Sequence, residues 1–137
     1  MQDFDPEVQR AVNRIQSEEV TRAVIVAARA SGFRSVNLDL IYGLPGQSLE
    51  PWMRSLRTAL ELRPEHLSCY ALTVEAGTPL AADPSRHPDD DDQADKYLLA
   101  EERLCALEGR FGDLVARREL GDEVVDDGLV LLHARGA

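Results

Sequence analysis

The sequence predicts an α/β fold in which parallel strands alternate with helices. Two observations support this prediction. Between residues 5 and 73 the apolar positions change from helical spacing to strand spacing twice, and the connections are only a few residues long. At 137 residues the chain is also far shorter than the about 250 residues of a complete eight-stranded β/α barrel. Two parallel strands alone leave a sheet incomplete, so we expect further strands from elsewhere or a fragment of a larger fold.

Two helices are predicted at the start of the chain. Asp5 is a suitable N-cap for the first helix, with Pro6 at the first helical position. Ser17 is a suitable N-cap for the second, and Gly32 a suitable residue after its last turn. The apolar stripe expected on the second helix consists of Val20, Val24, Ala27 and Ala28.

A strand, a helix and a second strand are expected next. Residues 35–42 alternate, with Leu38 and Leu40 on one face and Asn37 and Asp39 on the other. Ser48 begins a helix that runs to about Leu62, and residues 66–73 alternate again. The apolar face of that helix is expected to contain Leu49, Trp52, Met53, Leu56, Ala59 and Leu60.

The remaining third divides into an acidic loop, a helix and a tail. Residues 83–95 are rich in aspartate and are interpreted as a solvated loop leading into a helix from about Ala94 to Glu108. The buried side of this helix is expected to contain Tyr97, Leu98, Leu104, Cys105 and Leu107. Residues 109–137 would then form a divergent tail, with a hairpin that joins Val124-Val125 to 129–132 through a turn at 126–128. We therefore expect one domain over 1–108 and a separate tail.

Charge and composition disfavour several classes of protein. The 15 Lys and Arg against 25 Asp and Glu give a net charge of −10, which opposes binding to nucleic acid. The sequence contains no run of about 18 apolar residues, so no membrane span is predicted. The first residues show no signal peptide, so a cytoplasmic location is expected.

Few residues suggest chemistry by their pattern alone. Cys69 and Cys105 lack the spacing of a cluster motif and are expected to be small apolar side chains. The three histidines are scattered without metal-ligand spacing. Asp39, an acid within a strand, is either a ligand-binding carboxylate near the end of that strand or an acid at an exposed edge. Gln2 and Arg14 have the donors and acceptors for a polar ligand, but their pattern is that of ordinary surface residues.

The residues themselves are more specific than their spacing. Four segments resemble the radical S-adenosylmethionine (SAM) proteins of the oxygen-independent coproporphyrinogen III oxidase type, a family that includes haem chaperones. The resemblance runs from Gln2 to about Leu107, and the segments are QDFDPEVQ at 2–9, VNRIQ at 12–16, NLDLIYGLPGQ at 37–47 and HLSCYALTVEAGTPL at 66–80. The E-x-G-T-P-L segment at 75–80 and QADKY at 93–97 are more similar to the chaperone branch.

This resemblance implies a partial β/α (TIM-like) barrel and four residues that contact SAM. They are Gln2, Arg14, Asp39 and, through its backbone, Thr73. A porphyrinogen or haem is the implied small-molecule ligand. The family also holds a 4Fe–4S cluster on a C-x-x-x-C-x-x-C motif ahead of its Q-D-F segment. That motif is absent here, so no catalytic residue and no metal ligand are assigned.

Three interpretations of function remain open. The chain is a fragment of a coproporphyrinogen III oxidase-like enzyme, inactive alone because it cannot form the 5′-deoxyadenosyl radical without the cluster. Alternatively, it is a fragment of a haem chaperone that transfers haem without oxidase activity. In the third interpretation it is a degenerate, non-catalytic protein. A truncated or frameshifted reading frame is expected to explain both ends, and the oligomeric state is left open.

Overall fold

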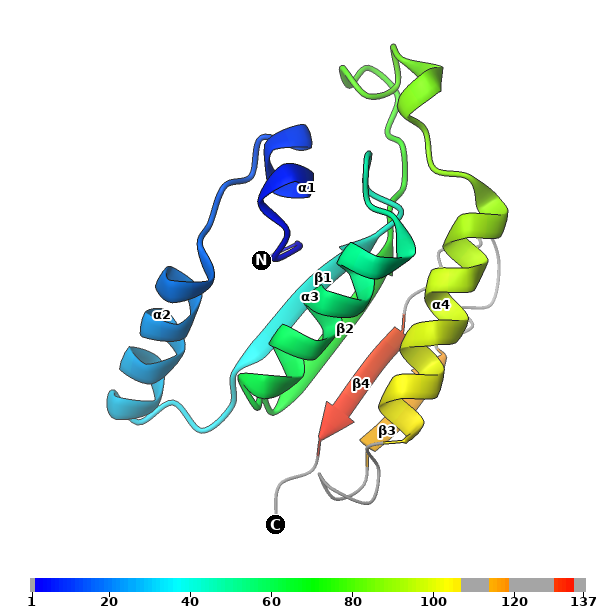
Figure 1. The fold of residues 1–137 in the computed structure, drawn as a ribbon. Coiled ribbons are helices and arrows are strands. Elements are labelled where there is room, and N and C mark those ends of the chain that lie inside the picture. Colours follow the sequence, from blue (N-terminus) through cyan, green and yellow to red (C-terminus); the bar gives the residue numbers. More distant parts are fainter. Residues whose placement is uncertain (1, 107–113, 119–129, 135–137) are drawn as a thin grey trace.

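The computed structural model describes residues 2–106, 114–118 and 130–134. Within this part of the chain, helices and strands alternate up to the second strand, as the sequence predicts (Figure 1). The elements are α1 (Pro6–Ala11), α2 (Glu18–Ala30), β1 (Asn37–Tyr42), α3 (Leu49–Glu61), β2 (His66–Ala71), the 3₁₀ turn η1 (Pro84–Arg86), α4 (Asp90–Cys105), β3 (Leu114–Arg118) and β4 (Val130–Ala134).

The four described strands form one sheet in the order β1-β2-β4-β3. β1 and β2 are parallel, with Asn37 beside His66 and Tyr42 beside Ala71. This confirms the predicted parallel β/α unit. β4 runs antiparallel to β2, and β3 runs antiparallel to β4, so the sheet as a whole is mixed.

The predicted hairpin in the tail is only partly tested. β4 confirms its second arm, whereas Val124-Val125 lies outside the described residues. The strand that pairs with β4 is Leu114–Arg118, a segment that the sequence pattern did not identify. Its sequence, LVARR, is short and does not alternate between apolar and polar residues, so periodicity gives little indication of a strand there.

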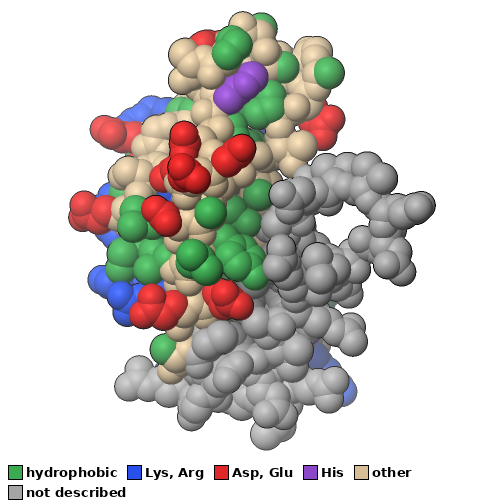
Figure 2. Space-filling view, turned by 90° about the vertical axis from the view of Figure 1, so that its right-hand side faces the viewer, with side chains coloured by type: hydrophobic (Ala, Val, Ile, Leu, Met, Phe, Trp, Pro, Cys, Tyr) green, Lys and Arg blue, Asp and Glu red, His purple; other side chains and the backbone are tan. Residues whose placement is uncertain are grey.

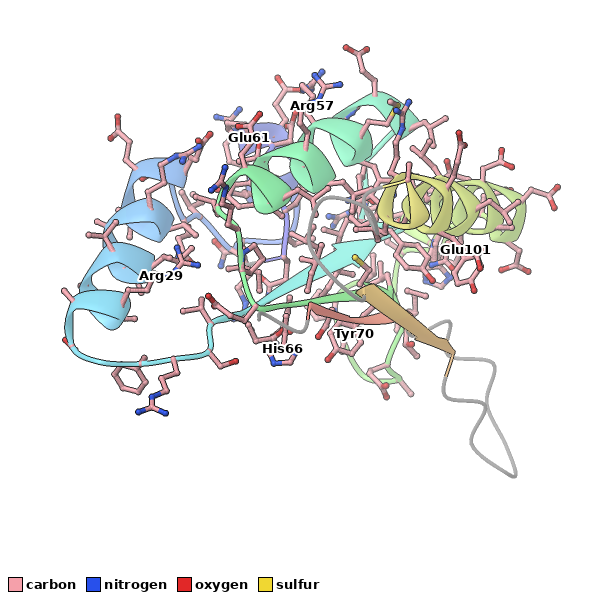
Figure 3. All side chains as sticks on the ribbon, turned by 90° about the horizontal axis from the view of Figure 1, so that it is seen from below. Arg29, Arg57, Glu61, His66, Tyr70 and Glu101 are labelled. Atoms are coloured by element: carbon pink, nitrogen blue, oxygen red, sulfur yellow. The ribbon has the colours of Figure 1, made fainter. Side chains whose placement is uncertain are left out.

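Helices α3 and α4 cover one face of the sheet, whereas His66 and Tyr70 lie on the opposite face (Figures 1 and 3). The alternation in β1 places Leu38, Leu40 and Tyr42 in the core. Trp52 and Leu56 of α3 pack in the same cluster and are almost completely buried. The other side of β1, which carries Asn37 and Asp39, is left exposed.

The helix starts follow local capping. The Asp5 carboxylate accepts hydrogen bonds from the backbone N–H groups of Glu7 and Val8, and the Ser17 hydroxyl accepts one from Val20. α4 begins at Asp90 rather than near Ala94, because Asp89 caps it. The following aspartates can then occupy the first turn, where negative charge is favourable.

Three predicted apolar faces are wrong in part. Val20 and Val24 are 52% and 58% exposed, and the buried positions of α2 are Thr21 and Ile25. Leu49 and Leu98, also expected inside, are 40% and 57% exposed. The side of an amphipathic helix that is buried depends on its neighbours, which the helical period does not reveal.

Acidic side chains are spread over the side of the molecule that α4 forms, with apolar side chains between them (Figure 2). Among the described helices, none is long and apolar enough to cross a bilayer.

Candidate functional site

The N-terminal segment runs along the outer edge of β1. The backbone N–H of Ile41 donates a hydrogen bond to the carbonyl oxygen of Gln2, with N and O 2.8 Å apart. The carbonyl oxygens of Val36 and Tyr42 instead accept hydrogen bonds from residues on the β2 side. The backbone N–H and C=O groups of the odd-numbered residues between them therefore point away from β2, because these groups alternate in direction along a strand. Gln2 is therefore fixed beside the carboxyl end of β1.

Asp39 lies on the face of β1 that the helices leave open. Its side chain is exposed, and Oδ1 accepts a hydrogen bond of 2.6 Å from the Asn37 amide. Its register neighbour in β2 is Ser68. Asp39 is therefore an exposed acid on the edge strand β1, two residues before the position that Gln2 contacts, and this placement agrees with both interpretations of the residue.

Thr73 follows the end of β2 and is exposed. The preceding residue, Leu72, donates its N–H to the Tyr42 carbonyl at 2.8 Å and accepts from the Gln93 amide at 3.2 Å. These two bonds hold the chain near the point where both parallel strands end. Thr73 is thus placed at the same edge of the sheet as Gln2.

Arg14 is separate from these three in the described contacts. It lies in the connection between α1 and α2, with its side chain exposed, and its backbone N–H donates to the Gln9 carbonyl at 2.9 Å. No described contact joins Arg14 to Gln2, Asp39 or Thr73. The structure therefore places Gln2 and Thr73 at the carboxyl end of β1 and β2, with Asp39 in the middle of β1.

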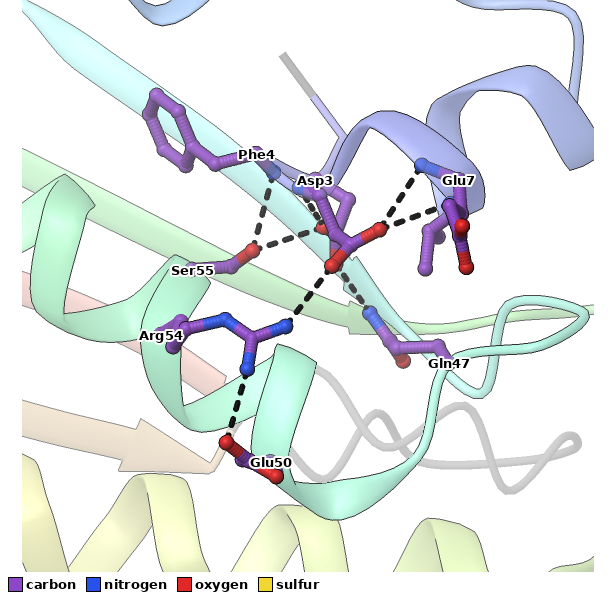
Figure 4. Close-up of polar contacts among 9 residues, drawn as sticks. Asp3, Phe4, Glu7, Gln47, Glu50, Arg54 and Ser55 are labelled. Carbon is purple, nitrogen blue, oxygen red and sulfur yellow. Dashed lines mark hydrogen bonds and ion pairs between the residues drawn. The ribbon is translucent and has the colours of Figure 1, made fainter.

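Asp3, which the sequence analysis did not single out, is a buried carboxylate beside this site. It is only 1% exposed. Its carboxylate accepts three hydrogen bonds, from the Asp5 N–H at 2.6 Å, the Ser55 hydroxyl at 2.8 Å and the Gln47 amide at 2.6 Å (Figure 4). Burial raises the Asp3 pKa, and these three bonds partly oppose the rise.

Gln47 links Asp3 to the turn after β1. Its Oε1 accepts from the Gly43 N–H at 2.8 Å, and its Nε2 donates to the Ile41 carbonyl at 2.9 Å as well as to Asp3. Gly43 has a φ of +81°, and a Cβ there would lie 2.4 Å from the Gln93 amide nitrogen. This turn therefore needs a glycine at position 43 for its backbone shape. The sequence signal that could have identified Gln47 is an amide directly after that turn.

The loop after β2 returns to α1. The Arg86 guanidinium donates to the Ala11 carbonyl at 2.7 Å, across 75 positions of sequence. His87 and the Leu80 carbonyl, 2.9 Å apart, close the same loop internally. Segment 73–87 therefore connects the end of β2 with the end of α1.

The described residues do not fit an iron–sulfur cluster. The sequence has two cysteines, and Cys69 is completely buried in the helix-covered core. Burial, with a smaller contribution from the Asp39 charge, raises the pKa of the Cys69 thiol to about 12. Such a thiol stays protonated and is a poor metal ligand. Among the described residues, no group of three His, Cys, Asp or Glu side chains is placed to hold a metal.

The predicted SAM contacts fit better as a set of donors and acceptors. SAM has ribose hydroxyls, an ammonium group and a carboxylate. An exposed carboxylate at Asp39, an amide at Gln2 and a guanidinium at Arg14 match these groups in charge and hydrogen-bonding capacity. The available residues therefore suit SAM itself, though not the cluster that accompanies it in the family.

A parallel β/α unit with helices on one face and polar residues at its carboxyl edge defines part of a β/α barrel protein. Comparison with known proteins identifies the family. The heme chaperone HemW of Mycobacterium tuberculosis (strain H37Rv) is 43% identical over 110 residues, which are 77% of this chain and 28% of that protein. The oxygen-independent coproporphyrinogen III oxidase of Pseudomonas aeruginosa is 50% identical over 70 residues, or 51% of this chain and 15% of that protein.

A solved structure agrees with these relatives. Coproporphyrinogen III oxidase (HemN) from Escherichia coli, described as a radical SAM enzyme, superposes with a TM-score of 0.65 and 37% identity. The match covers 80% of this chain and 25% of that protein. No family model matches the chain. The chain belongs to the radical SAM proteins of the coproporphyrinogen III oxidase and haem chaperone type, and it spans about a quarter or less of the length of these relatives. Both the resemblance and the partial-barrel fold are thereby confirmed.

Proposed function

We propose that this chain carries SAM-binding residues of a coproporphyrinogen III oxidase-like radical SAM protein. The binding residues are Gln2, Arg14, Asp39 and Thr73. The observation that supports this proposal most directly is the hydrogen bond from Ile41 to Gln2, because it fixes Gln2 beside the strand that carries Asp39. SAM supplies the sulfonium group from which radical SAM chemistry starts.

Each residue has a role that follows from its chemistry. The Asp39 carboxylate accepts hydrogen bonds from the ribose hydroxyls or the ammonium group. The Arg14 guanidinium pairs with the carboxylate of the methionine moiety, and the Gln2 amide can both donate and accept. The backbone of Thr73 adds a contact from the end of β2. These roles bind and orient SAM at the carboxyl edge of the sheet.

The activity proposed for the whole protein is oxidation of a porphyrinogen, with the 1–108 domain contributing to its barrel. We expect no turnover from this chain alone. Its two cysteines are too few for a cluster, which needs three or four thiolates, and Cys69 is sealed in the core. Binding of SAM is therefore the property to test.

A haem chaperone is the second candidate. The match to HemW extends over 110 residues, against 70 for the oxidase, so more of this chain resembles the chaperone. The E-x-G-T-P-L segment at 75–80 is also more similar to the chaperone branch. Under this proposal the tetrapyrrole is bound and transferred rather than oxidised.

Calorimetric titration with SAM tests the main proposal. We expect saturable binding that Asp39→Asn weakens at least about 10-fold, because hydrogen bonds to a charged group are worth about 1.5–3 kcal/mol. Asp95→Asn, an exposed aspartate on α4, is the matched control and should leave affinity unchanged. If the chain does not bind SAM, or if the two variants behave alike, the assignment is wrong.

Titration with haem, followed by its absorbance, tests the second candidate. A haem chaperone segment should bind haem stoichiometrically and produce no decarboxylated product from coproporphyrinogen. Absence of haem binding would remove the support for this candidate and leave the SAM proposal standing.

A further inference from the structure

We propose that Asp3 and Gln47 act as a positioning pair that holds Gln2 in place for SAM binding. This inference rests on the proposed function. Neither residue is one of the four predicted contacts, and both are buried, at 1% and 4% exposure. They would act through the backbone of Gln2 rather than by touching the ligand.

The contacts form a closed ring around the end of β1. The Ile41 N–H donates to the Gln2 carbonyl, and the next residue, Asp3, accepts from the Gln47 side chain. The same Gln47 nitrogen donates to the Ile41 carbonyl at 2.9 Å. Both outward-facing backbone groups of Ile41 are thus used, one by Gln2 and the other by Gln47. Movement of Gln2 away from β1 would break this ring.

The ring is also anchored to α3 and to the start of the chain. The Ser55 hydroxyl, fully buried on α3, donates to the Asp3 carboxylate and accepts from the Phe4 N–H at 3.0 Å (Figure 4). The main chain on either side of Asp3 is therefore tied to the sheet on one side and to α3 on the other. Gln9 adds a further bond, donating its amide to the Asp3 carbonyl at 2.7 Å.

The polarity of the pair makes it testable. Asp3 accepts every bond that it makes with its carboxylate, so Asp3→Asn must turn an N–H₂ group toward a donor, either the Gln47 amide or the Asp5 N–H. Rotation of the Gln47 amide cannot relieve the first conflict, because its other atom faces the Gly43 N–H donor. Gln47→Glu alone opposes two carboxylates in a buried site. The double variant restores the donor–acceptor match between positions 3 and 47, because the new amide at position 3 can donate to the new carboxylate at position 47. The Ile41 carbonyl then faces an acceptor in place of its former donor, so the recovery is partial.

The experiment compares four proteins: wild type, Asp3→Asn, Gln47→Glu and the double variant. SAM affinity is measured by calorimetry, and the hydrogen exchange rate of the Ile41 amide by NMR. We expect each single variant to weaken SAM binding at least about 10-fold and to increase Ile41 exchange, and the double variant to recover part of both. If the pair were merely structural, the single variants would have lower thermal stability, and the double variant would not regain SAM affinity.

The outcomes separate the two proposals. Wild-type SAM binding that the single variants leave unchanged overturns the positioning role and keeps the proposed function. A double variant that binds SAM no better than the single variants also overturns it. If wild type does not bind SAM, the proposed function fails and the positioning role fails with it. The hydrogen exchange rate of the Ile41 amide still tests whether the ring of hydrogen bonds holds Gln2 against β1. An unchanged rate in Asp3→Asn would show that the pair does not hold Gln2.

Discussion

The carbonyl oxygen of Gln2 accepts a hydrogen bond from the backbone N–H of Ile41, 39 positions later in the chain. This bond brings the start of the chain to the free edge of β1, where Asp39 faces the side of the sheet that the helices leave open. It therefore attaches Gln2, one of the four residues that the family resemblance predicts at the SAM site, to the strand that carries Asp39, another of them.

The core around Trp52 should be sensitive to loss of a single polar contact. Trp52 is fully buried, its ring centroid lies 5.6 Å from that of Tyr42, and its indole N–H donates to the Lys96 carbonyl at 3.0 Å. Trp52→Phe removes that donor and leaves a cavity, so we expect a loss of about 2–3 kcal/mol in the free energy of unfolding. Urea unfolding followed by circular dichroism measures it. Phe33→Leu, at an exposed position, should change stability by less than about 0.5 kcal/mol.

The thiol of Cys69 should be unreactive in the folded protein. Its pKa, raised to about 12 by burial and by the Asp39 charge, leaves almost no thiolate at pH 8. We expect iodoacetamide to modify Cys69 only after unfolding in urea, as followed by mass spectrometry of the peptide that contains it. Rapid modification without urea would show that the helix-covered core opens readily.

Asp5 should contribute stability that is lost in acid. Burial raises its pKa, but the N–H groups of Glu7 and Val8 and the Arg54 guanidinium together hold it below the usual 3.8. A carboxylate whose pKa is lower in the folded state stabilises the fold above the unfolded-state pKa, and this contribution is lost as pH falls through the folded-state value. The urea concentration at the unfolding midpoint of wild type should therefore decrease as the pH is lowered below about 4. The midpoint of Asp5→Asn should decrease less steeply over the same pH range. An equal pH dependence of the midpoint in the two proteins would show that Asp5 does not contribute this stability.

The features that the sequence predicts well are local ones. Asp5 and Ser17 cap helices because a cap needs only the residue itself and the next two or three N–H groups. The alternation in β1 identifies its buried face for a similar reason, since strand period and side-chain direction are linked. The specific run from Asn37 to Gln47 then identifies the family without any knowledge of contacts.

The features that the sequence does not predict depend on distant segments. Asp3 is an ordinary acid until Gln47 and Ser55 enclose it, from positions more than 40 residues away. The exposed valines of α2 have the period of a buried stripe, but the described neighbours cover the side that carries Thr21 and Ile25. Periodicity predicts that a helix has an apolar side, but the packing of neighbouring segments determines which side of the helix is buried.

The turn after β1 provides a matched pair of glycines for the last prediction. Gly43 and Gly46 have similar left-handed backbones, with φ of +81° and +77°, so alanine should cost about 1–2 kcal/mol at either position. They differ in surroundings. A Cβ at Gly46 meets nothing within 4 Å, whereas one at Gly43 would lie 2.4 Å from the Gln93 amide, which bonds the Leu72 carbonyl.

Gly43→Ala should therefore destabilise the protein by about 1 kcal/mol more than Gly46→Ala, because it also displaces the Gln93 hydrogen bond. Urea unfolding of the two variants gives this difference directly. Gln93→Ala removes the clash and the bond together, so in that background the two glycine substitutions should have nearly equal effects. A persistent difference there would mean that the turn itself, and not Gln93, separates the two positions.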